Sequence, residues 1–212
     1  GHARGETRST NSVFWKLIQP CSAWLTAVLV LHARTHGRNA SSCLAEAHGS
    51  DYTERMKKTV YLDTTIPSYY YDNRRQTAFF RHTTQEWFRK YRSCYDIYVS
   101  EATLVGASAG GYPAKNTVVE FVRRWKNLRH FAILEQSVAA YVENFLMPAK
   151  YGGDALHLAY ASHYKIDFLM TWNCEHLANA NKREHIRVIN TRMGLYVPEI
   201  VTPFELVAER KG

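Results

Sequence analysis

Oxygen-bearing side chains follow several apolar stretches of this sequence, and their chemical types suit a hard cation. They are Asp63, Ser100, Glu101, Asp154, Thr171 and Asn173. Carboxylate, hydroxyl and amide oxygens are the ligands that Mg²⁺ and Mn²⁺ prefer in proteins. At a phosphodiester such an ion polarises the phosphoryl oxygen, activates water and shields the leaving oxygen. These residue types therefore predict a Mg²⁺ or Mn²⁺ site, if the fold brings them to one place.

Short apolar runs alternate with helical stretches from residue 59 to residue 201. Strands are expected at residues 59–62, 97–99, 131–134, 167–171 and 200–201. Helices are expected to begin at 64 and 101, and to cover 76–92, 114–126, 137–146, 155–164 and 180–193. This alternation is typical of βαβ units, and it predicts an α/β fold, a three-layer α/β/α sandwich with a mainly parallel sheet. Ligands bind such sheets outside the carboxyl ends of the strands, which is where the oxygen-bearing side chains would converge.

The first 55 residues differ from the rest of the chain. A basic, polar start precedes an apolar run at 21–31 that is far too short to span a bilayer, and residues 32–55 have little periodicity. A signal peptide is one interpretation of this pattern. We favour the other, in which residues 1–55 are a poorly ordered or non-native extension and residues 56–212 form the domain. Residues 1 to about 50 are then expected to be dispensable for stability.

Composition bounds the possible partners and the compartment. Apolar residues make up 46% of the chain, enough for a substantial core, and the formal net charge of +8 is compatible with a polyanionic partner such as RNA. The four cysteines, at positions 21, 43, 94 and 174, have no CxxC spacing, so we interpret them as reduced thiols of a cytoplasmic protein. No apolar run is long enough to predict a membrane partner.

Three segments resemble the motifs of PIN domains, the fold of small metal-dependent ribonucleases such as VapC-type toxins. VYLDTTIPS at 60–68 resembles their opening strand, GDALHLA at 153–159 their central helix motif, and LMTWN at 169–173 their fourth-strand motif. The longer stretch at 171–179 is especially similar to one subgroup of bacterial PIN proteins. The resemblance implies a Mg²⁺- or Mn²⁺-dependent endoribonuclease that acts on RNA. It also implies a small antitoxin partner and a possible homodimer.

The resemblance assigns roles to individual residues, and one expected carboxylate is missing. Asp63 matches the first acidic ligand of the family and Asp154 the third, so both are expected to be catalytic and to bind the metal. Gly106 stands where the family has a glutamate, and Asn173 where an aspartate is common. Glu101 is the nearest substitute, but five helical positions turn it by about 140° from Gly106.

Further residues are expected to support this site. Thr64 follows Asp63, and Thr171 stands with Asn173 at the end of the fourth strand. Arg74 and Arg75, after three tyrosines, are expected to contact RNA phosphate. A glutamate at position 106 is expected to raise metal affinity and rate. Two functions stay open: a weakened endoribonuclease of the toxin type or of another RNA-processing role, and a catalytically depleted module that binds RNA or a protein partner. Each aspartate also has a simpler interpretation as the cap of the helix that follows it.

Overall fold

The computed structural model describes residues 57–148 and 152–207, so the extension predicted at 1–55 lies outside the described residues. Its five-stranded sheet is parallel throughout, with the order β3-β2-β1-β4-β5. The strands are β1 (Lys58–Leu62), β2 (Tyr95–Ser100), β3 (Lys126–Leu128), β4 (Phe168–Met170) and β5 (Glu199–Val201). The predicted α/β fold with a mainly parallel sheet is confirmed.

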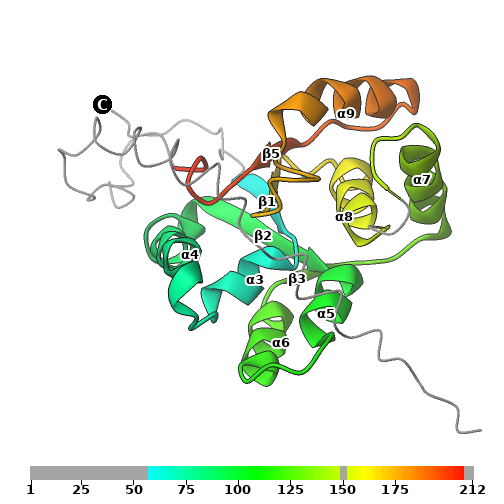
Figure 1. Ribbon diagram of the computed structural model, residues 1–212. Coiled ribbons are helices and arrows are strands. Elements are labelled where there is room, and N and C mark those ends of the chain that lie inside the picture. The colour runs from blue at the N-terminus through cyan, green and yellow to red at the C-terminus, as the bar shows by residue number, and fades with distance from the viewer. Residues whose placement is uncertain (1–56, 149–151, 208–212) are drawn as a thin grey trace, which may run out of the picture.

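Helices cover both faces of the sheet (Figure 1). One face carries α3 (Thr65–Tyr70), α4 (Ala78–Lys90) and α6 (Lys115–Arg123), and the other carries α7 (Ala132–Glu143), α8 (Gly152–His163) and α9 (Ala180–Arg192). The remaining helix of the described part, α5 (Glu101–Ser108), follows β2 and contacts both α6 and α8. The predicted three-layer sandwich is therefore confirmed. None of the helices in residues 57–148 and 152–207 is long and apolar enough to cross a membrane.

The central position of β1 in the sheet explains why apolar and polar side chains do not alternate along it. In β1, Val60 and Leu62 join the apolar cluster under α3, α4 and α6, whereas Tyr61 joins the cluster under α7, α8 and α9. All three side chains are fully buried. A parallel sheet covered on both faces buries every position of its inner strands, so such strands are apolar throughout.

The third strand was predicted at the wrong place. The run Phe131–Leu134 was expected to be a strand, but Phe131 is the N-cap residue of α7 and the next three residues are its first turn. A short apolar run fits a buried strand or a helix equally well. Here Phe131 and Ile133 are half exposed and only Leu134 is buried, as on one helical turn. The true third strand, β3, is a three-residue edge strand whose first two residues are polar and exposed.

The order of the strands creates a switch point between β1 and β4. From β1 the chain adds β2 and β3 on one side, and it later adds β4 and β5 on the other. Ligand sites of doubly wound sheets form at the carboxyl ends of the two strands that flank such a point. Asp63 follows β1 and Thr171 follows β4. The strand order therefore places Asp63 and Thr171 at the position where sheets of this kind bind ligands.

A buried amide holds α9 to the neighbouring helices. Asn190 has no exposed surface, and its Nδ2 donates to Ser162 Oγ and to the Tyr196 carbonyl oxygen, each at 2.8 Å. Its Oδ1 accepts a hydrogen bond of 2.7 Å from the Tyr141 hydroxyl. One side chain of α9 thereby joins α7, α8 and the segment that leads to β5. Loss of the amide would leave the buried Tyr141 hydroxyl without this partner and would remove one hydrogen bond each from Ser162 Oγ and the Tyr196 carbonyl oxygen.

Replacement of Asn190 by alanine removes these hydrogen bonds and leaves a cavity. It should therefore lower the free energy of unfolding by about 2–4 kcal/mol. Urea denaturation followed by circular dichroism measures the loss. The matched control is Asn144→Ala, which removes only an exposed bond to the Ala140 carbonyl oxygen. Equal losses in the two variants would contradict a special role for the buried amide.

Candidate functional site

Asp63 is held between the ends of the two central strands. Its backbone nitrogen donates to the Met170 carbonyl oxygen at 3.2 Å, continuing the pairing of β1 with β4. Oδ1 accepts from Thr65 N at 2.9 Å and from Thr65 Oγ1 at 2.5 Å. Oδ2 accepts from Thr171 Oγ1 at 2.5 Å. The carboxylate is 1% exposed, and three donors from both sides of the switch point fix its orientation.

A chain of hydrogen bonds connects Asp63 to Asp154. Thr171 Oγ1, which donates to Asp63, accepts from the backbone nitrogen of Asn173 at 2.9 Å. Asn173 Nδ2 in turn donates to Asp154 Oδ2 at 2.8 Å, and Asn173 Oδ1 accepts from His176 N at 3.0 Å. Asp154 lies in the first turn of α8, which begins three residues earlier than the predicted start at residue 155. The loop after β4 thus brings the two predicted catalytic carboxylates to the same end of the sheet.

Burial dominates the electrostatics of both carboxylates. It raises the pKa of Asp63 to about 6, although the bonds from Thr171 and Thr65 oppose the shift. Burial, and after it the negative charge of Asp63, raises the pKa of Asp154 to about 7, against the bond from Asn173. Each carboxyl group resists ionisation because it leaves water, and the second resists further because the first is near. A cation at this place would relieve both effects.

A third acidic ligand is absent from the part of the chain that the structure describes. In residues 57–148 and 152–207, no group of three or more His, Cys, Asp or Glu side chains has the arrangement of a metal site. Glu101 is exposed in the first turn of α5, where its charge raises the pKa of Tyr160 after the larger effect of burial. The predicted substitute thus acts on Tyr160, and its role as a metal ligand stays a prediction.

Gly106 is required by a close contact between α5 and the start of α3. A Cβ atom placed on Gly106 would lie 2.7 Å from Thr64 Cγ2 and 3.1 Å from Thr64 Cβ, and closer still to Thr64 Oγ1. Real Cβ atoms are essentially never found at such distances, so any side chain at position 106 must displace Thr64. The position therefore faces the residue that follows Asp63. The threonine fills the space that a glutamate would need, so Gly106→Glu alone requires Thr64 to move, and its expected gain in metal affinity and rate stays a prediction.

Beneath the carboxylates lies a buried polar network centred on Tyr61. Its hydroxyl lies 2.6 Å from Ser100 Oγ and 2.7 Å from His157 Nδ1, and it accepts a bond of 3.3 Å from Thr103 Oγ1. The other ring nitrogen of His157 lies 3.2 Å from Thr64 Oγ1. Burial lowers the pKa of His157 to about 4, so the ring is neutral at pH 7 and satisfies one contact as donor and one as acceptor. This network fixes the position of Thr64 against Gly106.

The remaining predicted residues take different places. Thr171 bonds Asp63 directly, whereas Thr64 bonds His157, and its neighbour Thr65 supplies the hydroxyl that reaches Asp63. Arg74 pairs with Asp72 at 2.6 Å, and Arg75 is exposed at the start of a short 3₁₀ helix. Their contact with RNA stays a prediction.

Two further charges near Asp154 were not identified from the sequence. The positive charge of Lys182 lowers the pKa of Asp154 and the negative charge of Glu175 raises it, both by less than burial and Asp63 do. Lys182 also donates to the Leu146 carbonyl oxygen at 3.0 Å, from the start of α9. No sequence motif marks either residue, because the fold of the loop after β4 decides that they approach α8.

No protein-family model matches this chain, and a search of curated proteins finds no match.

The pKa of Asp63 makes stability depend on pH in a defined direction. Between about pH 4 and the raised pKa, the folded protein binds a proton that the unfolded chain releases, so the free energy of unfolding falls as pH rises. Asp63→Asn removes the buried charge. It should therefore be more stable than the parent by about 1–3 kcal/mol at pH 7.5, with the difference vanishing near pH 4.

Thermal and urea unfolding between pH 4 and 8 measure this difference. The control is Asp96→Asn, which removes an exposed carboxylate paired with Lys126 at 3.4 Å and should shift stability little at any pH. A variant that is less stable at pH 7.5 than at pH 4, in parallel with the parent, would show that Asp63 does not carry the effect.

Proposed function

We propose that this protein is a metal-dependent endoribonuclease of the VapC-like toxin type, with a weakened metal site. The observation that carries the proposal is the pair of carboxylates, Asp63 and Asp154, joined through Thr171 and Asn173 at the switch point of a parallel sheet. A buried carboxylate whose charge raises the pKa of a partly buried neighbouring carboxylate is costly without a cation. Their position is the one at which sheets of this topology bind ligands.

The oxygen ligands are of the type that a hard divalent cation prefers, but their total negative charge is low. Asp63 and Asp154 would hold Mg²⁺ or Mn²⁺, and the second lone pair of Asn173 Oδ1 is a neutral ligand at most, because the first accepts from His176 N. When bound, the ion supplies Lewis acidity and a more acidic water. Thr65 and Thr171 orient the Asp63 carboxylate, and Asn173 orients Asp154. Preformed orientation of this kind lowers the cost of assembling the reacting groups.

RNA is the substrate that the charge balance favours. The net charge of +8 gives long-range attraction to a polyanion, and exposed Arg75 lies in the segment between α3 and α4. A ribonuclease of this type implies a small antitoxin protein as partner and a second copy of the chain as a dimer partner. It also implies a cytoplasmic location. These partners and the location are part of the proposal.

One observation favours the second candidate, a module that binds RNA or a partner without turnover. Thr64 occupies the space in front of Gly106, and no third carboxylate completes the pair within the described residues. Two carboxylates neutralise a divalent ion formally, but they leave most of its coordination positions to water and substrate. The two candidates differ in one property, which is whether metal at millimolar concentration restores cleavage.

A metal titration distinguishes the endoribonuclease from the binding module. Added Mn²⁺ at pH 7.5 should raise the melting temperature of the parent protein, with half of the effect at roughly millimolar concentration for so sparse an oxygen site. The same titration should give cleavage of a mixed single-stranded RNA pool. Asp63→Asn and Asp154→Asn should each lose the melting shift, and should reduce cleavage by about 100-fold or more.

Asp96→Asn serves as the control and should behave like the parent, because its carboxylate is exposed and distant from Thr171 along the sheet. Metal-dependent stabilisation without any cleavage would favour the binding module. Cleavage that is equal in the parent and in Asp63→Asn would refute the site itself.

A double substitution tests the missing carboxylate. Thr64→Gly removes the atoms that a side chain at 106 would meet, and glycine is accepted at a helix N-cap. Combined with Gly106→Glu, it should lower the Mn²⁺ concentration needed for half stabilisation by about tenfold, since a third negative ligand joins the ion. Thr64→Gly alone is the matched control. If the double variant binds metal no better than this control, the carboxylate at 106 does not reach the site.

A further inference from the structure

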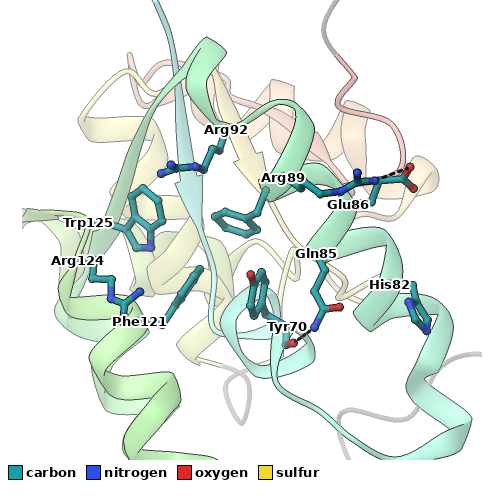
Figure 2. A pocket seen from close by; sticks show the side chains of 10 residues that line it. Tyr70, His82, Gln85, Glu86, Arg89, Arg92, Phe121, Arg124 and Trp125 are labelled. Atoms are coloured by element: carbon teal, nitrogen blue, oxygen red, sulfur yellow. Dashed lines mark hydrogen bonds and ion pairs between the residues drawn. The ribbon is translucent and has the colours of Figure 1, made fainter. Parts of the chain in front are cut away.

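Figure 2 shows a pocket on the helical layer of α3, α4 and α6. It has a volume of about 870 Å³ and lies between α4, α6 and the end of α3. Its lining residues are Tyr70, His82, Gln85, Glu86, Phe88, Arg89, Arg92, Phe121, Arg124 and Trp125. Arg92 precedes β2 and Trp125 precedes β3, so this pocket extends to the amino ends of these strands, whereas Asp63 follows the carboxyl end of β1. The proposed nuclease site does not use it.

Aromatic rings form the wall of this pocket. Phe88 and Phe121 are buried and pack edge to face at 5.2 Å between ring centroids. Tyr70 stacks on Phe121 at 5.0 Å, and Trp125 meets Phe121 at 5.7 Å. Tyr70 and Trp125 are only partly buried, so the rim of the wall is accessible. A planar aromatic ligand would find a rigid stacking surface here.

The polar groups of the pocket are mainly hydrogen-bond donors that lack an acceptor. Within the described residues, the side chains of Arg92 and Arg124 make no hydrogen bond or ion pair, and the buried Nε1 of Trp125 has no hydrogen-bond partner. Arg89 reaches only Glu86, at 3.9 Å, and Glu86 also pairs with Lys90. Figure 2 shows Arg92 and Arg124 on the Trp125 side of the pocket, with Arg89 turned towards Glu86. The Trp125 side therefore holds positive charge without a counter-ion.

We propose that this pocket binds a nucleotide, either free or as one unit of an RNA chain, with its phosphate on Arg92 and Arg124 and its base beside Trp125 and Tyr70. The guanidinium groups of arginine match the oxygens of a phosphate in shape and charge. The partly exposed rings of Trp125 and Tyr70 offer faces on which a base can stack. An isolated phosphate would use the arginines and leave the aromatic wall uncovered, in a pocket much larger than itself.

Isothermal titration calorimetry on the full chain tests the pocket. The probes are AMP, UMP, adenosine, inorganic phosphate and a short single-stranded oligoribonucleotide, all at one ionic strength and without divalent metal. AMP and UMP should both bind, because stacking tolerates any base, and each at least about tenfold more tightly than adenosine or phosphate. Binding of the oligoribonucleotide but not of the mononucleotides, with the arginine dependence described below, supports the pocket and identifies RNA as the source of the nucleotide.

Substitutions assign the binding to these side chains. Arg92→Gln and Arg124→Gln should each weaken nucleotide binding by about tenfold or more, since each removes charge-assisted bonds. Arg123→Gln is the matched control: it removes an exposed arginine of the same helix that does not line the pocket, and should have little effect. Trp125→Phe keeps a ring and removes the N–H, so it should weaken binding less than Trp125→Leu does, with melting curves verifying that both variants fold.

Several results would overturn the proposal. They are the absence of binding by every nucleotide probe, equal losses in Arg123→Gln and Arg124→Gln, and phosphate binding as tight as that of AMP. Asp63→Asn should leave binding unchanged in this metal-free assay, because Asp63 lies at the other end of the sheet. This variant separates the pocket from the proposed nuclease site, so that either proposal can fail alone.

Discussion

The buried carboxylate of Asp63 is the constraint on which the rest of the site depends. It has almost no exposed surface, and it is tolerated because Thr65 and Thr171 supply three hydrogen bonds from opposite sides of the switch point. These bonds require β1 and β4 to be neighbours in register, and they fix the loop after β4. That loop then carries Asn173 to Asp154. Sheet order, loop geometry and the second carboxylate thus follow from satisfying the first.

The price of this arrangement is high electrostatic energy at neutral pH. Burial raises the pKa of both carboxylates, and the proximity of Asp63 adds to the shift at Asp154. Directly beside them, the neutral ring of His157 and the Tyr61 hydroxyl hold Thr64 close to Gly106. The two carboxylates therefore lie close together at an electrostatic cost, while the network of His157, Tyr61 and Thr64 beside them is tightly packed and uncharged. The proposed cation-binding role accounts for both properties.

The two ends of the sheet differ in charge and in shape. The carboxyl end concentrates acidic oxygen atoms under tight packing, whereas the amino end opens between α4 and α6 into a pocket with unpaired arginines and aromatic rings. Both features arise from one principle, the placing of polar groups where strands begin or end while the apolar middle is covered on both faces. The two proposed sites would both suit a polyanion, through a bound metal at one end and through guanidinium groups at the other.

The sequence by itself determined the α/β alternation, four of the five strands and the two aspartates at one end of the sheet, because these depend on local periodicity and on where a strand stops. It could not assign residues 131–134, since a four-residue apolar run fits a strand or a helical turn. Only the tertiary structure decided that Thr65, not Thr64, bonds Asp63, and that Thr64 closes the space before Gly106. The same holds for the approach of Arg92, at the start of the segment before β2, to Arg124 and Trp125, which lie between α6 and β3. Contacts between distant segments depend on how helices pack, and no local pattern encodes that packing.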